Sequence, residues 1–312
     1  MNDKINLLSI VVPTYNGSGT IVSLIEDLVI CFNQHKFEIV VVNDHSPDST
    51  HEKIENILNK YSDKITYIKL SKNFGENNAV IAGLNYCHGD YAIIMDDDYQ
   101  NPPSEALKLA EYSLSNNYDV VYTNYRVKSD SLIRNLMSKF SNFTARLLIK
   151  KPPNIYLSSF KCIKKNIIQE IISFEGPEPN IDGIILSKTN NLGSCNVRHD
   201  KRKVGKSNYN LLKLMSHYGN LIINNTTLPI HIFSFLGLIL TSISFVLFII
   251  TIFEKITNPN VPIGYTTIVI LIVFFSGIQF LFLGLIGEYL GRLLRGLKNE
   301  KHFIIDYIKK RN

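Results

Sequence analysis

The chain has 312 residues, of which 45% are hydrophobic and 19% are charged, so it is too apolar for a disordered protein. Its 33 basic and 27 acidic residues leave a net charge of +6, which suits anionic lipid, nucleotide phosphates and nucleic acid about equally well. The four cysteines are too few and too widely spaced for a disulfide scaffold or a structural zinc site.

The first 125 residues alternate short β-rich runs with helical stretches, which predicts a mostly parallel sheet covered by helices on both faces. Strands are expected at residues 8–12, 37–42, 65–70, 91–95 and 119–122. Helices are expected at residues 20–33, 51–61, 77–86 and 103–115. Ligands of such sheets bind beyond the carboxyl ends of the strands, so the residues that follow each strand are the candidates for function.

Polar segments follow three of these strands, at residues 13–17, 43–50 and 96–103. Asp44 in the second segment is suited to accept from ribose hydroxyls or from a pyrimidine imide N–H. The third begins with three consecutive carboxylates, Asp96, Asp97 and Asp98, which repel one another unless a cation is present. Either this segment holds Mg²⁺ or Mn²⁺ together with substrate phosphates, or it is an acidic turn that caps the following helix.

A basic, acid-free segment follows at residues 131–169. Apolar side chains recur in it at spacings of three and four, at Leu132, Leu136, Phe140, Phe143 and Leu147. This pattern predicts a basic amphipathic helix over 131–151 that lies in a membrane interface. The alternative is an ordinary surface helix whose apolar stripe faces the core.

Two long apolar stretches, residues 228–253 and 263–290, are of a length to span a bilayer, and the alternative is a pair of buried core helices. Their short connection predicts an antiparallel hairpin. Basic residues gather before the first span and after the second, which predicts that both termini and a domain at residues 1–212 are cytoplasmic. Residues 291–312 are then a basic cytoplasmic tail. The N-terminal apolar run is too short for a cleavable signal peptide.

Four motifs occur in an order that resembles family 2 glycosyltransferases of the GT-A fold. They are Val11–Asn16 (VVPTYN), Asn43–Ser46 (NDHS), Asn73–Gly75 with Ala82–Leu84, and Met95–Pro103 (MDDDYQNPP). The last is similar to the Asp-x-Asp-x-Gln-x-Pro-Pro element of the branch that uses polyprenyl phosphate, the dolichyl- and undecaprenyl-phosphate glycosyltransferases. The resemblance implies a GT-A-type, Rossmann-like α/β domain with an interfacial helix and a C-terminal transmembrane hairpin.

The resemblance also assigns roles to individual positions. It implies nucleotide binding by Pro13, Tyr15, Asn16, Asp44, Ser46, Asn73 and Asp97. It implies a Mg²⁺ or Mn²⁺ site at Asp96, Asp98 and Gln100. A loop that closes over the donor diphosphate is implied at Arg202, Lys206, Ser207 and Tyr209. Binding of the acceptor phosphate is expected at Arg134, Arg146, Ser158 and Lys161, and catalytic roles at Asp98 and Arg202.

Three positions depart from the family pattern. Gly17 stands where a glutamate is usual, and Asn43 and Ile155 stand where aspartates are common. These departures concern the contacts to the base and the acceptor rather than the reaction class. The chain also has no tryptophan, so it lacks the Gln-x-x-Arg-Trp motif of processive family 2 synthases such as cellulose and hyaluronan synthases.

The function expected from the resemblance is inverting transfer of a single sugar from a nucleotide-diphosphate sugar, with UDP as the expected nucleotide, to undecaprenyl phosphate. The product would serve cell-surface glycan assembly or modification. One alternative is a membrane-bound transferase that adds sugar directly to a glycan or lipid, and another is a non-catalytic module that binds nucleotide sugars.

The expected location is the bacterial inner membrane. A homo-oligomer formed through the spans and the tail is also expected. Nucleic acid is not an expected partner, because the basic residues lie beside membrane elements and no recognition motif accompanies them.

Overall fold

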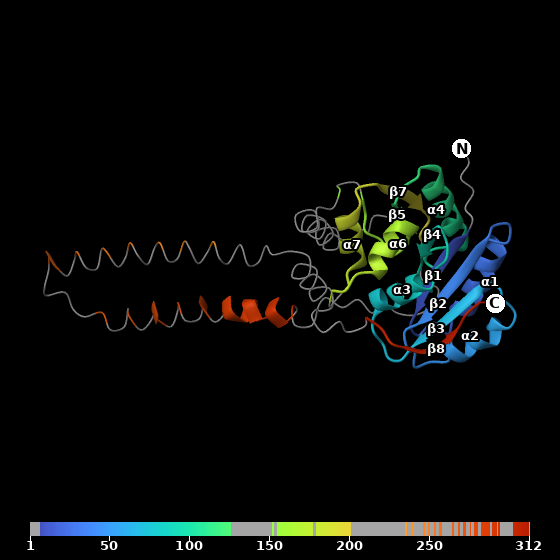
Figure 1. Ribbon diagram of the computed structural model, residues 1–312, viewed down its shortest axis with the longest axis horizontal. Helices are drawn as coiled ribbons and strands as arrows, with labels where there is room; N and C mark the ends of the chain where they lie inside the picture. The colour runs from blue at the N-terminus through green and yellow to red at the C-terminus, as the bar shows by residue number, and fades with distance from the viewer. Residues whose placement is uncertain are drawn as a thin grey trace. The chain divides into compact units, whose positions relative to one another are not determined.

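The computed structural model describes residues 7–125, 152, 155–176, 179–200 and 302–311, together with scattered positions between 235 and 293. The chain divides into two compact units. The first consists of Met1–Tyr209 and Lys301–Asn312, and the second of Asn210–Glu300. Every strand that the structure describes belongs to the first unit (Figure 1).

Strands and helices alternate along the first part of this unit. The strands are β1 (Leu8–Thr14), β2 (Phe37–Asn43), β3 (Ile65–Leu70) and β4 (Tyr91–Ile94). The helices are α1 (Ile21–Cys31), α2 (Thr50–Leu58), α3 (Glu76–Asn85) and α4 (Pro103–Ser115). β1 pairs in parallel with both β2 and β4, and β2 pairs in parallel with β3. The predicted α/β alternation and parallel sheet are therefore confirmed.

The remaining elements extend the sheet on both sides. They are β5 (Val120–Tyr125), β6 (Lys161–Lys164), α6 (Lys165–Ile172), α7 (Ile181–Lys188), β7 (Leu192–Val197) and β8 (Ile305–Lys309). The strand order is β7-β5-β6-β4-β1-β2-β3-β8. β6 runs antiparallel to β4 and β5, and β8 runs antiparallel to β3. The sheet is thus mixed, with a parallel centre.

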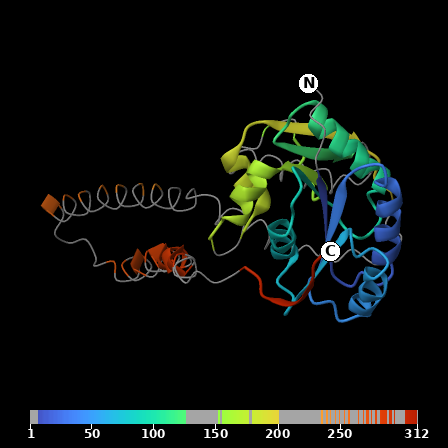
Figure 2. The ribbon, with the colours of Figure 1, turned by 45° about the vertical axis from the view of Figure 1, so that its right-hand side comes forward.

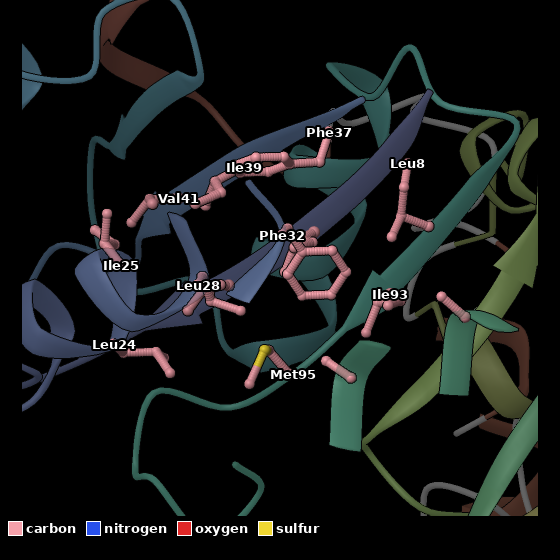
Figure 3. Close-up of a cluster of buried hydrophobic side chains, with 14 of the residues drawn as sticks. Leu8, Leu24, Ile25, Leu28, Phe32, Phe37, Ile39, Val41, Ile93 and Met95 are labelled. Atoms are coloured by element: carbon pink, nitrogen blue, oxygen red, sulfur yellow. The ribbon is translucent and has the colours of Figure 1, made fainter. Parts of the chain in front are cut away.

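Helices cover both faces of the sheet (Figure 2), and the two faces bury separate hydrophobic clusters. Alternate residues of a strand point to opposite faces, so Ile10 and Val12 of β1 join one cluster and Val11 joins the other. The first cluster packs α1 against β1, β2 and β4, with Phe32 and Met95 among its residues (Figure 3). Burial on both faces explains why these strands are continuous apolar runs.

The last strand, β8, comes from the segment that the sequence predicts only as a basic tail. It forms the edge of the sheet beside β3. Arg311 follows it, and its Nη1 lies 3.0 Å from Oε2 of Glu38, whose side chain is fully buried in β2. Glu38 also accepts hydrogen bonds from the Ser9 hydroxyl at 2.6 Å and the His88 backbone N–H at 2.6 Å. The C-terminal segment is thereby attached to the core of the domain.

The predicted spans at 228–253 and 263–290 lie largely outside the described residues. Among the residues that are described, the structure contains no helix with the length and apolar character needed to cross a membrane. The predicted interfacial helix at 131–151 also lies outside the described residues.

Replacing Arg311 with alanine is expected to lower the free energy of unfolding of the domain by about 1–3 kcal/mol, because a buried carboxylate loses its cation. Chemical denaturation of the purified protein measures this. The matched control is Lys309→Ala, because Lys309 donates to Asn59 on the exposed surface, and surface hydrogen bonds contribute little. Equal effects of the two substitutions would contradict the structural role of Arg311.

Candidate functional site

The loops that follow β1, β2, β3 and β4 share an unusual backbone conformation. Asn16, His45, Gly75 and Tyr99 have φ angles of 60°, 57°, 90° and 61°. Non-glycine residues rarely adopt positive φ, because this conformation is strained and persists only where the surrounding structure holds it. Residues of this kind are concentrated at functional sites. Three of the four non-glycine examples among the described residues lie in these loops. The carboxyl edge of the sheet is therefore the candidate site.

Asp44 joins three of these loops. Its side chain is only 4% exposed, and its two carboxylate oxygens accept the backbone N–H groups of Phe74 at 2.7 Å and Gly75 at 2.8 Å. Its own N–H donates to the carbonyl of Thr14 at 3.0 Å. Burial raises the pKa of Asp44, and the two N–H groups oppose this rise. The side chain thus holds the loops together, and its predicted contact with the nucleotide stays a prediction.

The other predicted nucleotide residues lie around these loops. Pro13 is buried in β1, whereas Asn16 and Asn73 are exposed and the Tyr15 side chain is 44% exposed. The backbone N–H of Asn16 donates to the Ser46 hydroxyl at 3.0 Å. The structure therefore brings the loops after β1 and β2 together, and the predicted contacts of these residues with a nucleotide stay predictions.

Asp97 faces the loop after β1. The Thr14 hydroxyl donates to its Oδ2. Loss of hydration, and then the charges of Asp96 and Asp98, raise the pKa of Asp97 to about 6 despite this hydrogen bond. A Cβ atom at Gly17 would lie 2.1 Å from the same oxygen. The departure at this position thus has a physical reason: any side chain there would displace the Asp97 carboxylate.

Asp96 and Asp98 are held by different neighbours. Oδ2 of Asp96 accepts from the Ser159 hydroxyl at 2.8 Å, and Oδ1 of Asp98 accepts from the backbone N–H of Gln100 at 3.0 Å. No group of three or more His, Cys, Asp or Glu suited to hold a metal occurs in the described part of the chain. The predicted metal ligands Asp96, Asp98 and Gln100 offer oxygen atoms from two carboxylates and one amide. This set of hard oxygen ligands fits a divalent cation that completes its coordination shell with substrate phosphates.

Two residues predicted to bind the acceptor phosphate have other contacts. Ser158 and Lys161 are each 4% exposed. The Ser158 hydroxyl donates to the Phe160 carbonyl at 2.8 Å and accepts from the Thr123 backbone N–H at 3.1 Å. The Lys161 ammonium is paired with the Asp182 carboxylate at the start of α7. Both side chains thus have partners within the fold, and their predicted contact with the acceptor phosphate stays a prediction.

Sequence reasoning missed His199, which follows β7. Its Nε2 lies 3.2 Å from Nε2 of Gln100, and its Nδ1 lies 3.3 Å from Oδ1 of Asn101. Its ring centroid lies 4.2 Å from that of Tyr125. These contacts attach the segment leading to Arg202 to the proposed metal site. The only sequence feature that could have indicated a role for His199 is its position three residues before Arg202. A single histidine after a strand does not by itself indicate a particular chemistry.

The other predicted site residues lie outside the described part of the chain. They are Arg134, Arg146, Arg202, Lys206, Ser207 and Tyr209. Their roles stay predictions.

The loops that form this site lie within a segment, residues 9–172, that matches the glycosyl transferase family 2 model. That segment is slightly more than half of the chain. The chain belongs to glycosyl transferase family 2. It is therefore a glycosyltransferase. The loop residues of its four motifs lie at the carboxyl edge of the sheet, whereas Ala82–Leu84 of the third motif lies in α3, buried against the sheet.

Relatives match this glycosyltransferase over nearly its whole length. The undecaprenyl-phosphate 4-deoxy-4-formamido-L-arabinose transferase of Proteus mirabilis (strain HI4320) is 27% identical over 310 residues, which cover 98% of this chain and 95% of the relative. The enzyme of the same name from Pectobacterium atrosepticum is 30% identical over 309 residues, covering 98% and 94%.

A solved structure shares the fold of the domain. Glucosyl-3-phosphoglycerate synthase from Mycobacterium tuberculosis, in complex with Mn²⁺, UDP and glucosyl-3-phosphoglycerate, superposes with a TM-score of 0.53 at 16% identity. The match covers 70% of this chain and 77% of that one.

Substituting Asp44 with asparagine is expected to reduce the free energy of unfolding by about 1–3 kcal/mol, because an amide nitrogen replaces one acceptor and leaves a loop N–H unpaired. Denaturant titration measures the loss. Asp63→Asn is the matched control, since Asp63 is exposed and precedes β3 at the opposite edge of the sheet. A loss no larger than that of the control would argue against the loop-holding role of Asp44.

Proposed function

We propose that this glycosyltransferase transfers one sugar from a nucleotide-diphosphate sugar to undecaprenyl phosphate, with inversion at the anomeric carbon. The observation that carries the proposal is the match to undecaprenyl-phosphate transferases over 98% of the chain. That match extends beyond the family 2 segment into the region where the spans are predicted. The products are undecaprenyl-phosphate-sugar, for cell-surface glycan assembly or modification, and free nucleoside diphosphate.

The proposed donor is a UDP-sugar bound at the carboxyl edge of the sheet. Tyr15 and Asn73 offer exposed side chains beside the strained turns, where a base and ribose have access. Asp96, Asp98 and Gln100 would hold Mg²⁺ or Mn²⁺. When bound, such a cation neutralises charge on the donor diphosphate and stabilises it as a leaving group. The solved structure of similar fold binds Mn²⁺ and UDP together, which supports this pairing.

The chemistry requires little from a general base. A phosphate monoester has a second pKa near 6, so the acceptor is already largely a dianion at neutral pH and attacks the anomeric carbon directly. The protein must instead bring two anions together and exclude water. Arg202 is proposed to neutralise the departing diphosphate, and Arg134 and Arg146 the acceptor phosphate, because a guanidinium pairs with two phosphate oxygens.

We further propose that the enzyme lies in the bacterial inner membrane, with spans at 228–253 and 263–290, an interfacial helix at 131–151, and its domain and both termini in the cytoplasm. Large apolar side chains that are exposed at described helical positions support this. They include Phe235, Ile239, Val246, Ile249, Phe253, Ile268, Ile272, Leu283 and Ile286. A protein surrounded by water rarely exposes so many, whereas lipid solvates them.

Asp98→Asn is expected to reduce sugar transfer at least 100-fold, because the substitution removes a carboxylate from the proposed metal site. Transfer of label from nucleotide sugars into a mild-acid-labile lipid product measures this. Asp63→Asn is the control and should keep full activity. Full activity of Asp98→Asn, or undiminished activity in excess chelator, would contradict the metal role.

Arg134→Ala is expected to raise the KM for undecaprenyl phosphate about tenfold or more while changing the donor KM little, because the guanidinium is proposed to bind only the acceptor. Arg134→Lys is the matched variant and should have an intermediate KM, since it keeps the charge and loses the forked geometry. A larger effect on the donor KM than on the acceptor KM would refute the assignment.

A further inference from the structure

A buried polar cluster lies behind the turn that follows β2, and the proposed chemistry does not use it. Its centre is Tyr67 of β3, which is 0% exposed. The Tyr67 hydroxyl lies 3.1 Å from Nδ2 of Asn43 and 2.9 Å from Nδ1 of His51 in α2. A buried tyrosine hydroxyl with two side-chain partners specifies their orientation as well as contributing to stability.

The direction of each hydrogen bond follows from the neighbours. Oδ1 of Asn43 accepts the backbone N–H of Ser46 at 2.8 Å, so the amide group at Nδ2 must donate to Tyr67. The Tyr67 hydroxyl is then free to donate to Nδ1 of His51. Burial raises the pKa of Tyr67 to about 12, which keeps the hydroxyl proton in place. An aspartate at position 43 would lack the N–H group that this arrangement uses.

The C-terminal strand covers this cluster. Tyr307 of β8 pairs with Lys69, two residues after Tyr67, so both tyrosines lie on one face of the sheet. The Tyr67 ring lies 6.1 Å from Tyr307 and 5.7 Å from His51, measured between centroids. His51 and Tyr307 in turn lie 5.8 Å apart. Side chains from two other elements, α2 and β8, therefore pack against the Tyr67 ring.

The cluster is connected to the turns proposed to bind the nucleotide. Asn43 fixes the Ser46 backbone across His45, which has a φ of 57°. The Ser46 hydroxyl then accepts the backbone N–H of Asn16, which has a φ of 60°. Two strained turns are thus held by a chain of hydrogen bonds that begins at Tyr67.

The structure assigns Tyr67 as a positioning residue for the nucleotide donor, acting through Asn43 on the turns at residues 14–17 and 43–46. The assignment rests on the proposed function and deepens it, because it makes a tyrosine outside the family motifs, covered by the C-terminal strand, part of the donor site. Tyr67 itself does not contact the nucleotide in this proposal.

The test is Tyr67→Phe in the full-length, detergent-solubilised enzyme, with Kd measured by calorimetric titration of UDP and of GDP in the presence of Mn²⁺. The substitution removes only the hydroxyl and keeps the ring packing. The Kd of the nucleotide that binds is expected to rise about 3- to 10-fold, the effect of one buried hydrogen bond. The acceptor KM should stay unchanged. A purely structural role would instead lower the active fraction and leave Kd as it was.

Tyr118→Phe is the matched control, because Tyr118 is partly buried against Tyr112 just before β5 and is distant from the turns in the fold. Equal Kd values for Tyr67→Phe and Tyr118→Phe, with nucleotide binding by the wild type intact, would overturn the positioning role alone. Wild-type protein that binds neither UDP nor GDP would overturn the proposed function and this inference with it.

A double variant tests the route through Asn43. If Tyr67 acts on the turns by way of Asn43, then Tyr67→Phe should add no further loss of affinity to Asn43→Ala. Losses that multiply in the double variant would overturn that route.

Discussion

The carboxylate of Asp44 is the interaction on which the site depends. It is buried at the end of β2, where its oxygens accept two backbone N–H groups from the loop after β3. Its own N–H is bonded to the carbonyl at the end of β1. A buried carboxylate without hydrogen-bond donors would be strongly unfavourable. The loop after β3 must therefore keep its two N–H groups within hydrogen-bond distance of the Asp44 oxygens.

The charges of the site are arranged around that fixed edge. Three successive carboxylates follow β4, and each is held by a different neighbour: a serine from the segment before β6, a threonine of β1, and a backbone N–H of its own loop. The side chains of Asp96 and Asp98 are thereby directed differently from that of Asp97. Several carboxylates held in defined orientations suit a cation that also binds a diphosphate.

The C-terminal strand gives the domain a second long-range constraint. β7 and β8 are the two edge strands of the sheet, and the second compact unit lies between them in sequence. β8 closes the edge beside β3, which would otherwise present unpaired backbone groups. Through Tyr307 it also packs against His51 and Tyr67, which lie behind the turn after β2. The strand therefore contributes to the interior behind the site as well as to the edge.

The sequence by itself determined the parallel centre of the sheet and the placement of its motifs. Buried parallel strands are continuous apolar runs with polar residues at their ends, so β1 to β4 and the segments after them are legible from local pattern. Tertiary structure alone decided the rest. Lys161 is basic in the sequence but ion-paired inside the fold, and Gly17 is explained by the position of Asp97. His199, Tyr67 and β8 acquire their roles from partners distant in the chain, and no local periodicity records such pairings.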